Sequence, residues 1–307
     1  MANITLKQLR YFEALVQHGH FGRAAEASAV SQPALSIQIK ELEEELGVIL
    51  FERAPRQVRL TSFGEEFAAR VSTILRAVDE LGDLARTARD RLVGRLRIGV
   101  IPTIAPYLLP QLLGRLSDLH LGLDIHVRET LTPRLLAELS DGQLDCAILA
   151  LPVADPALTE VALFSEAMVL VRPKSDMPPP RPTVEDLRGE RLLLLEEGHC
   201  FRDQALSFCN IGAARPRQGL DGSSLSTLVQ MVGAGIGVTL IPEMAVPVET
   251  RSAAVSLARF DPPEPGRTVG MVWRKTSPLA DSLMLIAEEV RACGHTLSTA
   301  QEIAAVT

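Results

Sequence analysis

The sequence predicts an α/β protein with three parts, namely a small helical N-terminal domain, a linker helix and a larger domain made of two α/β halves. Short amphipathic helical segments occupy the first sixty residues, and the next stretch repeats its apolar residues with a heptad rhythm. From Gly94 onward, short β-branched runs alternate with helical segments. A chain of 307 residues with 47% hydrophobic content is long enough to bury more than one core.

Three short helices are predicted at the N-terminus. The segment "LKQLRYFEALVQHG" has apolar residues at helical spacing and ends in a glycine. In "HFGRAAEASAV", the small residues Ala24 and Ala25 allow another helix to cross closely. The third helix is expected to be capped by Ser31, with Pro33 in its first turn, and to end at Gly47. Its apolar stripe comprises Leu35, Ile39, Leu42 and Leu46.

The second and third helices, joined by a tight turn, predict a helix-turn-helix. In that motif the start of the second helix enters the major groove of DNA. The following segment "VILFERAPRQVRLT" predicts two short strands around a turn that contains proline, which together form a basic wing. The alternative is a generic three-helix domain whose charges are merely solvated. The helix spacing, the cap and the wing agree with one another and favour DNA binding.

The residues expected to contact double-stranded promoter DNA lie on the third helix and in the wing. Gln32 and Gln38 suit base edges, whereas the cations suit phosphates. The full set is Ser31, Gln32, Pro33, Ala34, Ser36, Gln38, Lys40, Arg53, Arg56 and Arg59. The net charge of −7 is unusual for a DNA-binding protein, but the acidic residues of this part are gathered in "KELEEELG", apart from the basic wing.

The stretch "FGRAAEASAVSQPALSIQIKELEEELGVILFERAPRQVRLTSFGEEF" resembles the winged helix-turn-helix of LysR-type transcriptional regulators over nearly fifty positions. The resemblance implies a DNA-binding regulator and not an enzyme, acting on transcription by RNA polymerase. One departure is Ile37, because a basic residue is common at this position in the family.

The segment after Gly64 predicts a dimerising linker helix. Its apolar residues recur in steps of four and three, which is the rhythm of a coiled-coil seam or of core packing. The seam comprises Phe67, Val71, Ile74, Val78, Leu81, Ala85 and Ala88. A dimer suits DNA, because two-fold protein symmetry matches a palindromic site.

The larger domain is predicted from alternating strands and helices, with mostly parallel sheets and a ligand cleft between two halves. The LysR resemblance implies an effector domain like a periplasmic binding protein, in which the chain leaves one half near Val169 and returns near Thr268. The expected boundaries are 1–62 for the DNA-binding domain, 63–92 for the linker helix and 93–307 for the regulatory domain. Its two subdomains are 93–168 plus 268–307, and 169–267.

The N-terminus carries charge within its apolar pattern, and no apolar run reaches about 18 residues. We therefore expect a cytoplasmic protein with no membrane partner, in a compartment where thiols stay reduced. The segment "EEGHCFRDQALSFC" places Cys200 and Cys209 nine positions apart, in a chain with four cysteines. A disulfide, a metal site, an enzyme nucleophile and two unrelated thiols are the alternatives.

A metal site is weakly supported, because the chain has no Cys-x-x-Cys and its six scattered histidines supply no ligand pair beyond His199 beside Cys200. His199, as the sequence neighbour of Cys200, is poorly placed to act as its base. Inert core thiols fit Cys146 and Cys293, which lie in apolar segments, but fit Cys200 poorly because polar residues surround it. If 200–209 is helical, its ends lie about 13.5 Å apart along the axis. A disulfide needs Cα atoms within about 7 Å, so bonding requires the segment to unwind.

The stretch "LLLLEEGHCFRDQALSFC" resembles the hydrogen-peroxide-sensing branch of the LysR-type regulators. So do "GVIPTIAPYLLPQLL", "DGSSLSTLVQMVGAGIGVTLIPEMAV" and "RTVGMVWR", which extend the similarity over nearly the whole chain. The resemblance implies that Cys200 reacts with peroxide and that Cys209 resolves the product as a reversible disulfide. It also implies a peroxide pocket, to which Arg274 is expected to add charge. The pocket residues are Thr103, Thr132, His199 and Arg274.

Two alternatives to these pocket roles stay open. Thr103 and Thr132 each precede a predicted helix and suit N-caps as well as ligand contacts, whereas the "GSSLST" run is better explained as a cap than as a second ligand site. We expect a peroxide-responsive regulator, a dimer of dimers with neither metal nor cofactor, reset by a thiol reductant. A LysR-type regulator with a small organic effector in its cleft is the main alternative. A thiol peroxidase is disfavoured by the N-terminal domain.

Overall fold

The computed structural model describes residues 4–54, 57–87, 93–174, 181–187, 189–208 and 221–304. The chain divides into two compact units, Met1–Ala85 and Arg86–Thr307, and each is described by itself. None of the helices in the described ranges is long and apolar enough to cross a membrane.

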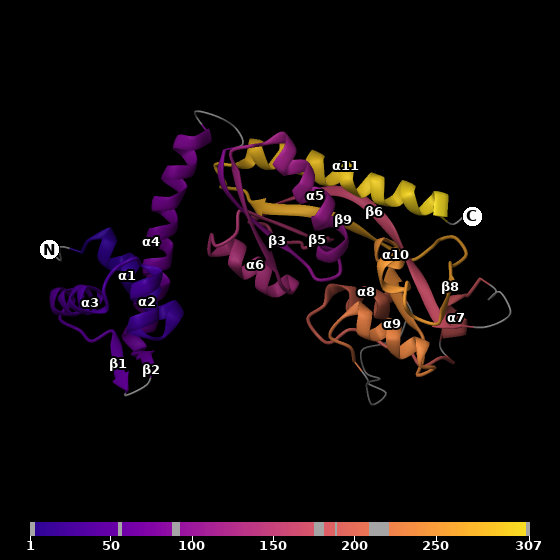
Figure 1. The fold of residues 1–307 in the computed structure, drawn as a ribbon, viewed down its shortest axis with the longest axis horizontal. Coiled ribbons are helices and arrows are strands. Elements are labelled where there is room, and N and C mark those ends of the chain that lie inside the picture. Colours follow the sequence, from indigo (N-terminus) through magenta and orange to yellow (C-terminus); the bar gives the residue numbers. More distant parts are fainter. Residues whose placement is uncertain are drawn as a thin grey trace. The chain divides into compact units, whose positions relative to one another are not determined.

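The first unit is the predicted winged helix-turn-helix. Its elements are α1 (Leu6–His18), α2 (Phe21–Ala27), α3 (Gln32–Leu46), β1 (Phe51–Ala54), β2 (Gln57–Leu60) and the long α4 (Ser62–Thr87) (Figure 1). Ser31 caps α3, as predicted, because its side chain accepts from the backbone N–H of Ala34. Gly47 ends the helix in the left-handed conformation. The strands β1 and β2 pair antiparallel and form the wing.

The core of the first unit is built from the apolar faces of its helices. Phe12, Leu15, Leu35, Ile39 and Leu42 are all buried within it. The first half of α4 packs onto the same core through Phe67, Val71 and Leu75. Phe67 and Val71, the first residues of the predicted heptad seam, therefore pack into the core of a single chain.

The second unit combines a seven-stranded sheet with helices. Its first part contains β3 (Gly94–Val100), α5 (Ala105–Leu119), β4 (Leu123–Glu129), α6 (Thr132–Ser140), β5 (Cys146–Leu151) and β6 (Leu158–Pro173). The middle contains α7 (Val184–Leu187), α8 (Cys200–Phe208), α9 (Leu225–Gly233), β7 (Thr239–Pro242), the 3₁₀ turn η1 (Glu243–Ala245), α10 (Val246–Glu249) and β8 (Val255–Ala258). The strand β9 (Gly266–Arg274) and α11 (Ala280–Ala304) complete it.

The sheet has the order β4-β3-β5-β9-β6-β7, with β8 also paired to β6. Its β4, β3 and β5 ladders are parallel, whereas β9, β6, β7 and β8 join antiparallel. The expectation of mostly parallel sheets was therefore wrong for the described strands. The reason is that β6 and β9 carry the chain between the two halves in opposite directions.

The strand β6 belongs to both halves of the unit. Up to Ala167 it pairs with β9, and from Met168 onward it pairs with β7 and then β8. The helix α11 lies along β6 and beside α5 (Figure 1). The apolar run at 191–195 forms isolated bridges, at Leu192 and Leu195. One continuous apolar core runs through the unit.

Candidate functional site

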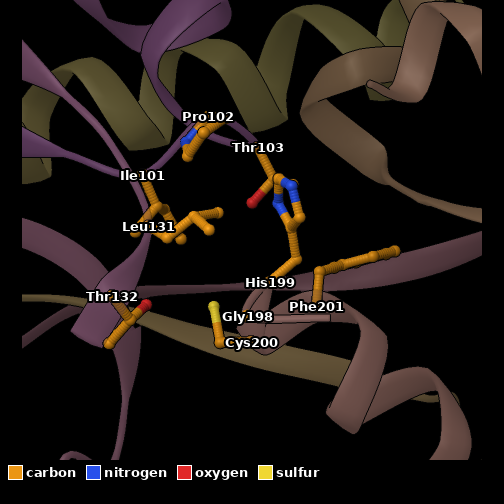
Figure 2. Close-up of a pocket in the computed structure, with 9 residues that line it drawn as sticks. All are labelled: Ile101, Pro102, Thr103, Leu131, Thr132, Gly198, His199, Cys200 and Phe201. Carbon is orange, nitrogen blue, oxygen red and sulfur yellow. The ribbon is translucent and has the colours of Figure 1, made fainter. Parts of the chain in front are cut away.

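A small hollow lies where the two halves of the second unit meet. The parallel strands β3 and β4 end side by side, and the loops that follow them form one wall. The start of α8 forms the opposite wall (Figure 2). The lining residues are Ile101, Pro102, Thr103, Leu131, Thr132, Gly198, His199, Cys200 and Phe201. The space between these side chains is small, about 160 Å³ when the open solvent at its mouth is counted.

Cys200 is the first residue of α8, and Figure 2 shows its sulfur directed into the hollow. The preceding Gly198 has φ of 94°, a left-handed conformation that glycine adopts without strain. A Cβ there would also stand 3.0 Å from a Leu131 side-chain carbon across the hollow. The half-buried thiol therefore faces the pocket from the N-terminus of a helix, where backbone N–H groups stabilise negative charge.

Thr132 presents a buried hydroxyl to the hollow. Within the described residues its Oγ1 has no hydrogen-bond partner. The N-cap of α6 is Leu131, and no side chain caps that helix. The N-cap alternative for Thr132 is thus wrong, and a buried polar group without a partner is costly to retain.

Thr103 is 2% exposed and bonded to a buried arginine. Its Oγ1 accepts from Nη1 of Arg267 at 2.7 Å, and its carbonyl accepts from Nη2 at 2.9 Å. The helix α5 begins after Ile104 without a side-chain cap, so the N-cap alternative fails for Thr103 too. Because the Thr103 oxygen accepts from Arg267, its own proton is left to donate.

Arg267 links the hollow to the rest of the unit, although the sequence did not single it out. Its Nε donates to Glu166 at 2.8 Å, and the other oxygen of Glu166 accepts from the backbone N–H of Met244 at 3.0 Å. Its guanidinium also lies over the ring of Phe201, 5.4 Å from the centroid. Arg267 therefore connects the loop after β3, the strand β6 and the start of α8.

The structure places Arg274 outside the hollow, contrary to prediction. Its Nη1 donates to the carbonyls of Leu139 at 2.6 Å and Leu144 at 2.9 Å, at the end of α6. Side chains alternate along a strand, so residues seven apart on β9 face opposite sides of the sheet. Arg267 and Arg274 are such a pair, and Arg267 is the one that reaches the hollow.

His199 is buried in the wall beside Thr103 (Figure 2). Burial lowers the pKa of its imidazole below the ordinary value, although the nearby charge of Glu196 opposes this shift. The ring is therefore neutral near pH 7 and can donate one hydrogen bond and accept another.

The start of α8 is held in place by Arg202. Its Nη1 donates to the carbonyl of Leu195 at 2.6 Å and lies 3.1 Å from Asp221. At the other end of α8, the ring of Phe208 packs against Phe260 at 5.1 Å. The helix predicted between the two cysteines is confirmed over Cys200–Phe208, whereas Cys209 lies outside the described residues.

The remaining two cysteines lie in the core. Cys146 on β5 and Cys293 on α11 are both fully buried, and burial raises the pKa of each thiol. The prediction that they are core thiols is confirmed. The "GSSLST" run is confirmed as a cap, because Ser224 accepts from the backbone N–H of Thr227 at the start of α9. Across the described ranges, no three His, Cys, Asp or Glu side chains are grouped as a metal would need.

The predicted DNA-contact residues of the first unit lie on the start of α3 and on the wing. Ser31, Gln32, Pro33, Ala34 and Lys40 are exposed, and Ser36 and Gln38 are half-buried. Arg59 is exposed on β2. Arg56 lies outside the described residues, as does the side chain of Arg53.

The second half of α4 differs from the first. Val71 is 1% exposed and belongs to the core of the first unit, whereas Ile74 is 46% and Leu81 66% exposed. Val78 is half-buried. Of the predicted seam, Ile74, Val78 and Leu81 are therefore the residues free to meet another helix, whereas the Ala85 side chain and Ala88 lie outside the description.

The fold and its two units define a regulator with a DNA-binding module and a ligand-sensing module. A model of the bacterial regulatory helix-turn-helix protein, lysR family, matches residues 6–65, and the LysR substrate binding domain matches residues 89–292. The chain belongs to the LysR family.

Within that family, the chain is similar to OxyR proteins. The DNA-binding transcriptional dual regulator OxyR of Escherichia coli K12 is 43% identical over 291 residues, which is 94% of this chain and 95% of that one. A full-length OxyR variant from Pseudomonas aeruginosa is 37% identical, with a TM-score of 0.75 and coverage of 95% and 99%. A hydrogen-peroxide-bound OxyR variant from Corynebacterium glutamicum is 34% identical, with a TM-score of 0.68 and coverage of 99% and 96%.

Proposed function

We propose that the protein is a hydrogen-peroxide-responsive transcriptional regulator switched by reversible disulfide formation between Cys200 and Cys209. The observation that carries the proposal is the hollow itself. A thiol at a helix N-terminus faces a buried Thr132 hydroxyl that has no partner among the described residues. A small polar molecule that accepts and donates hydrogen bonds satisfies that hydroxyl beside the sulfur.

Hydrogen peroxide fits this arrangement chemically. The Cys200 thiolate attacks one peroxide oxygen, the O–O bond breaks, and the second oxygen leaves as hydroxide and becomes water on protonation. The product is a sulfenic acid. Hydroxyls of Thr103 and Thr132 hold the two oxygens during the attack, while Arg267 fixes Thr103 from behind. The Cys209 thiol then attacks the sulfenic sulfur, a second water leaves, and the disulfide forms.

The size of the hollow argues against an organic effector at this position. Pockets for organic ligands typically measure about 300–1,000 Å³. The hollow is far smaller than that, and its walls include the apolar side chains of Ile101, Leu131 and Phe201. A metabolite would have to push these walls far apart, whereas a molecule as small as hydrogen peroxide would displace them only slightly.

The disulfide requires a change in α8. The helix runs from Cys200 to Phe208, so its ends are about 12 Å apart along the axis. The Cα atoms of a disulfide lie within about 7 Å of each other. Bond formation therefore unwinds α8 and removes Phe201 from its place over Arg267. We propose that this loss of structure is what alters the assembly on DNA.

The remaining parts of the proposal concern partners. The first unit binds promoter DNA, and the exposed Ile74 and Leu81 of α4 face a second copy. Two such dimers form the DNA-bound dimer of dimers, which acts on RNA polymerase. A thiol reductant resets the disulfide, since a bond formed at the expense of a native helix is more oxidising than a structural one.

The proposal is tested by peptide mapping of the full-length protein after one equivalent of hydrogen peroxide. We expect a Cys200–Cys209 linked peptide that dithiothreitol reverses, and a DNA footprint that changes with it. Cys200→Ser abolishes both effects, whereas Cys209→Ser accumulates sulfenic acid at Cys200. Cys293→Ala serves as the matched control and leaves the response intact. A bridge from Cys200 to Cys146, or a normal peroxide response in Cys200→Ser, refutes the proposal and leaves the effector-binding regulator.

A further inference from the structure

Ile37 is the large apolar residue exposed on α3, and 56% of its surface is accessible. It lies two positions after the buried Leu35 and two before the buried Ile39. Residues two apart on a helix point about 200° away from each other, so Ile37 faces directly away from the core of the unit. Burial within its own chain therefore does not explain this side chain.

The neighbours of Ile37 on the same face delimit a short reading surface. Pro33 and Ala34 lie one turn before it, and Lys40 lies one turn after it. Beyond Lys40 the helix turns acidic, and Glu44 pairs with Lys40 at 3.3 Å. Carboxylates are repelled by phosphates, so close contact with DNA is confined to the first turns of α3. Ile37 stands near the middle of that surface.

The chemistry of the major groove singles out one partner for an apolar side chain. The base edges there present hydrogen-bond donors and acceptors, and the apolar group among them is the C5-methyl of thymine. The adjacent Gln38 is polar and donates one amide N–H from Nε2 to Glu41 at 2.6 Å, so Ile37 is the side chain at this point of α3 that suits an apolar group. We infer that Ile37 reads a thymine methyl in each half-site and is a specificity-determining residue of this regulator.

This inference rests on DNA binding by α3, and its test separates the two. Binding sites are first selected from random DNA with the full-length chain. Each thymine of the selected site is then replaced in turn by uracil, which lacks only the C5-methyl. We expect one thymine per half-site at which uracil weakens binding about fourfold, the effect of one buried carbon group. Replacing both symmetric thymines weakens binding about fifteenfold.

Substitution of Ile37 completes the test as a cycle. Ile37→Ala loses affinity for thymine-containing DNA and becomes indifferent to uracil at that position, because the contact is already gone. Ile49→Ala is the matched control, since Ile49 is also exposed in the first unit, at 66%, but lies outside α3. For Ile49→Ala, the ratio of the affinities for thymine-containing and uracil-containing DNA should equal that of the unaltered chain.

The outcomes that overturn the inference are distinct from failure of the proposed function. Specific DNA binding with no uracil-sensitive thymine overturns the inference alone, and so does a uracil penalty that persists in Ile37→Ala. A change in sedimentation of Ile37→Ala with unaltered site preference assigns the residue to contact between copies. A chain that selects no DNA refutes DNA binding itself. The uracil scan needs no variant, so it is decisive even if Ile37→Ala is less stable.

Discussion

The hydroxyl of Thr132, which has no hydrogen-bond partner among the described residues, leads to a prediction about stability. In Thr132→Val a methyl group of nearly the same shape replaces the hydroxyl. The buried Oγ1 has no partner within the described residues, so its removal relieves a desolvation cost. Unsatisfied buried groups cost about 1–3 kcal/mol, and we expect the reduced protein to gain about 1–2 kcal/mol in its free energy of unfolding. Under the proposed mechanism the same change should also slow the reaction with peroxide, because one of the two hydroxyls proposed to hold the substrate is lost.

Thr103→Val is the matched comparison, because it makes the same chemical change at the other threonine of the same wall. The Thr103 oxygen accepts from Arg267, so valine leaves a buried guanidinium N–H without its acceptor. We expect a loss of about 1–3 kcal/mol in the free energy of unfolding. Both variants slow peroxide consumption, but they move stability in opposite directions.

The assay uses the single tryptophan of the chain, Trp273, which is buried on β9 and reports the second unit alone. Urea unfolding of the reduced protein, followed by its fluorescence, gives the free energy of unfolding of each variant. The rate of loss of the Cys200 thiol under excess peroxide gives reactivity. If Thr132→Val destabilised the protein as much as Thr103→Val does, the hydroxyl would have a structural partner and the reasoning would fail. Stabilisation with an undiminished peroxide rate would remove Thr132 from the chemistry.

Three further predictions concern the buried ion pair of Arg267, the imidazole of His199 and the two halves of α4. Arg267→Met leaves the Glu166 carboxylate buried without its cation. It should lower the free energy of unfolding, measured by urea titration, by about 3–5 kcal/mol. The double variant Arg267→Met with Glu166→Leu should recover part of this loss. Burial lowers the pKa of His199 in the folded protein. As pH falls below about 6.5, the unfolded state therefore takes up the proton first, and the free energy of unfolding declines. His199→Asn should make the free energy of unfolding depend less on pH between about pH 7 and pH 5. Val71→Asp should unfold the first unit, as seen by circular dichroism, whereas Leu81→Asp should keep it folded and lower the sedimenting mass.

The first unit could be predicted closely because its signals are local. Ser31 and Gly47 mark the ends of α3 through bonds to residues three or four positions away. Whether the linker seam packs within one chain or against a second copy could not be predicted from the sequence. A step of four and three residues is the same for a coiled coil and for packing onto a core, and only the contacts of Val71 distinguish them.

The site residues that could be predicted from the sequence are those that directly follow a strand or begin a helix. Thr103 and Thr132 come together because β3 and β4 are parallel neighbours, so the loops after them share one edge of the sheet. Arg267 was missed because it contacts Thr103 across 164 positions in sequence, and nothing local marks it as different from Arg274. Because side chains alternate along β9, only one of the two arginines faces the hollow. Which one does so depends on how β9 pairs with its neighbouring strands, and the local sequence does not determine that pairing.

The position of Cys200 at the first residue of α8 bears on how often the protein can respond. The thiol and the Phe201 ring over Arg267 belong to the same helical turn, so in the proposed switch the unwinding of that turn would also dismantle the pocket. A sensor built this way consumes one peroxide for each reset. Under the proposed mechanism it would work as a stoichiometric counter, whose output records how many protein molecules have reacted since the last reduction, and it would remove at most one peroxide per protomer between reductions.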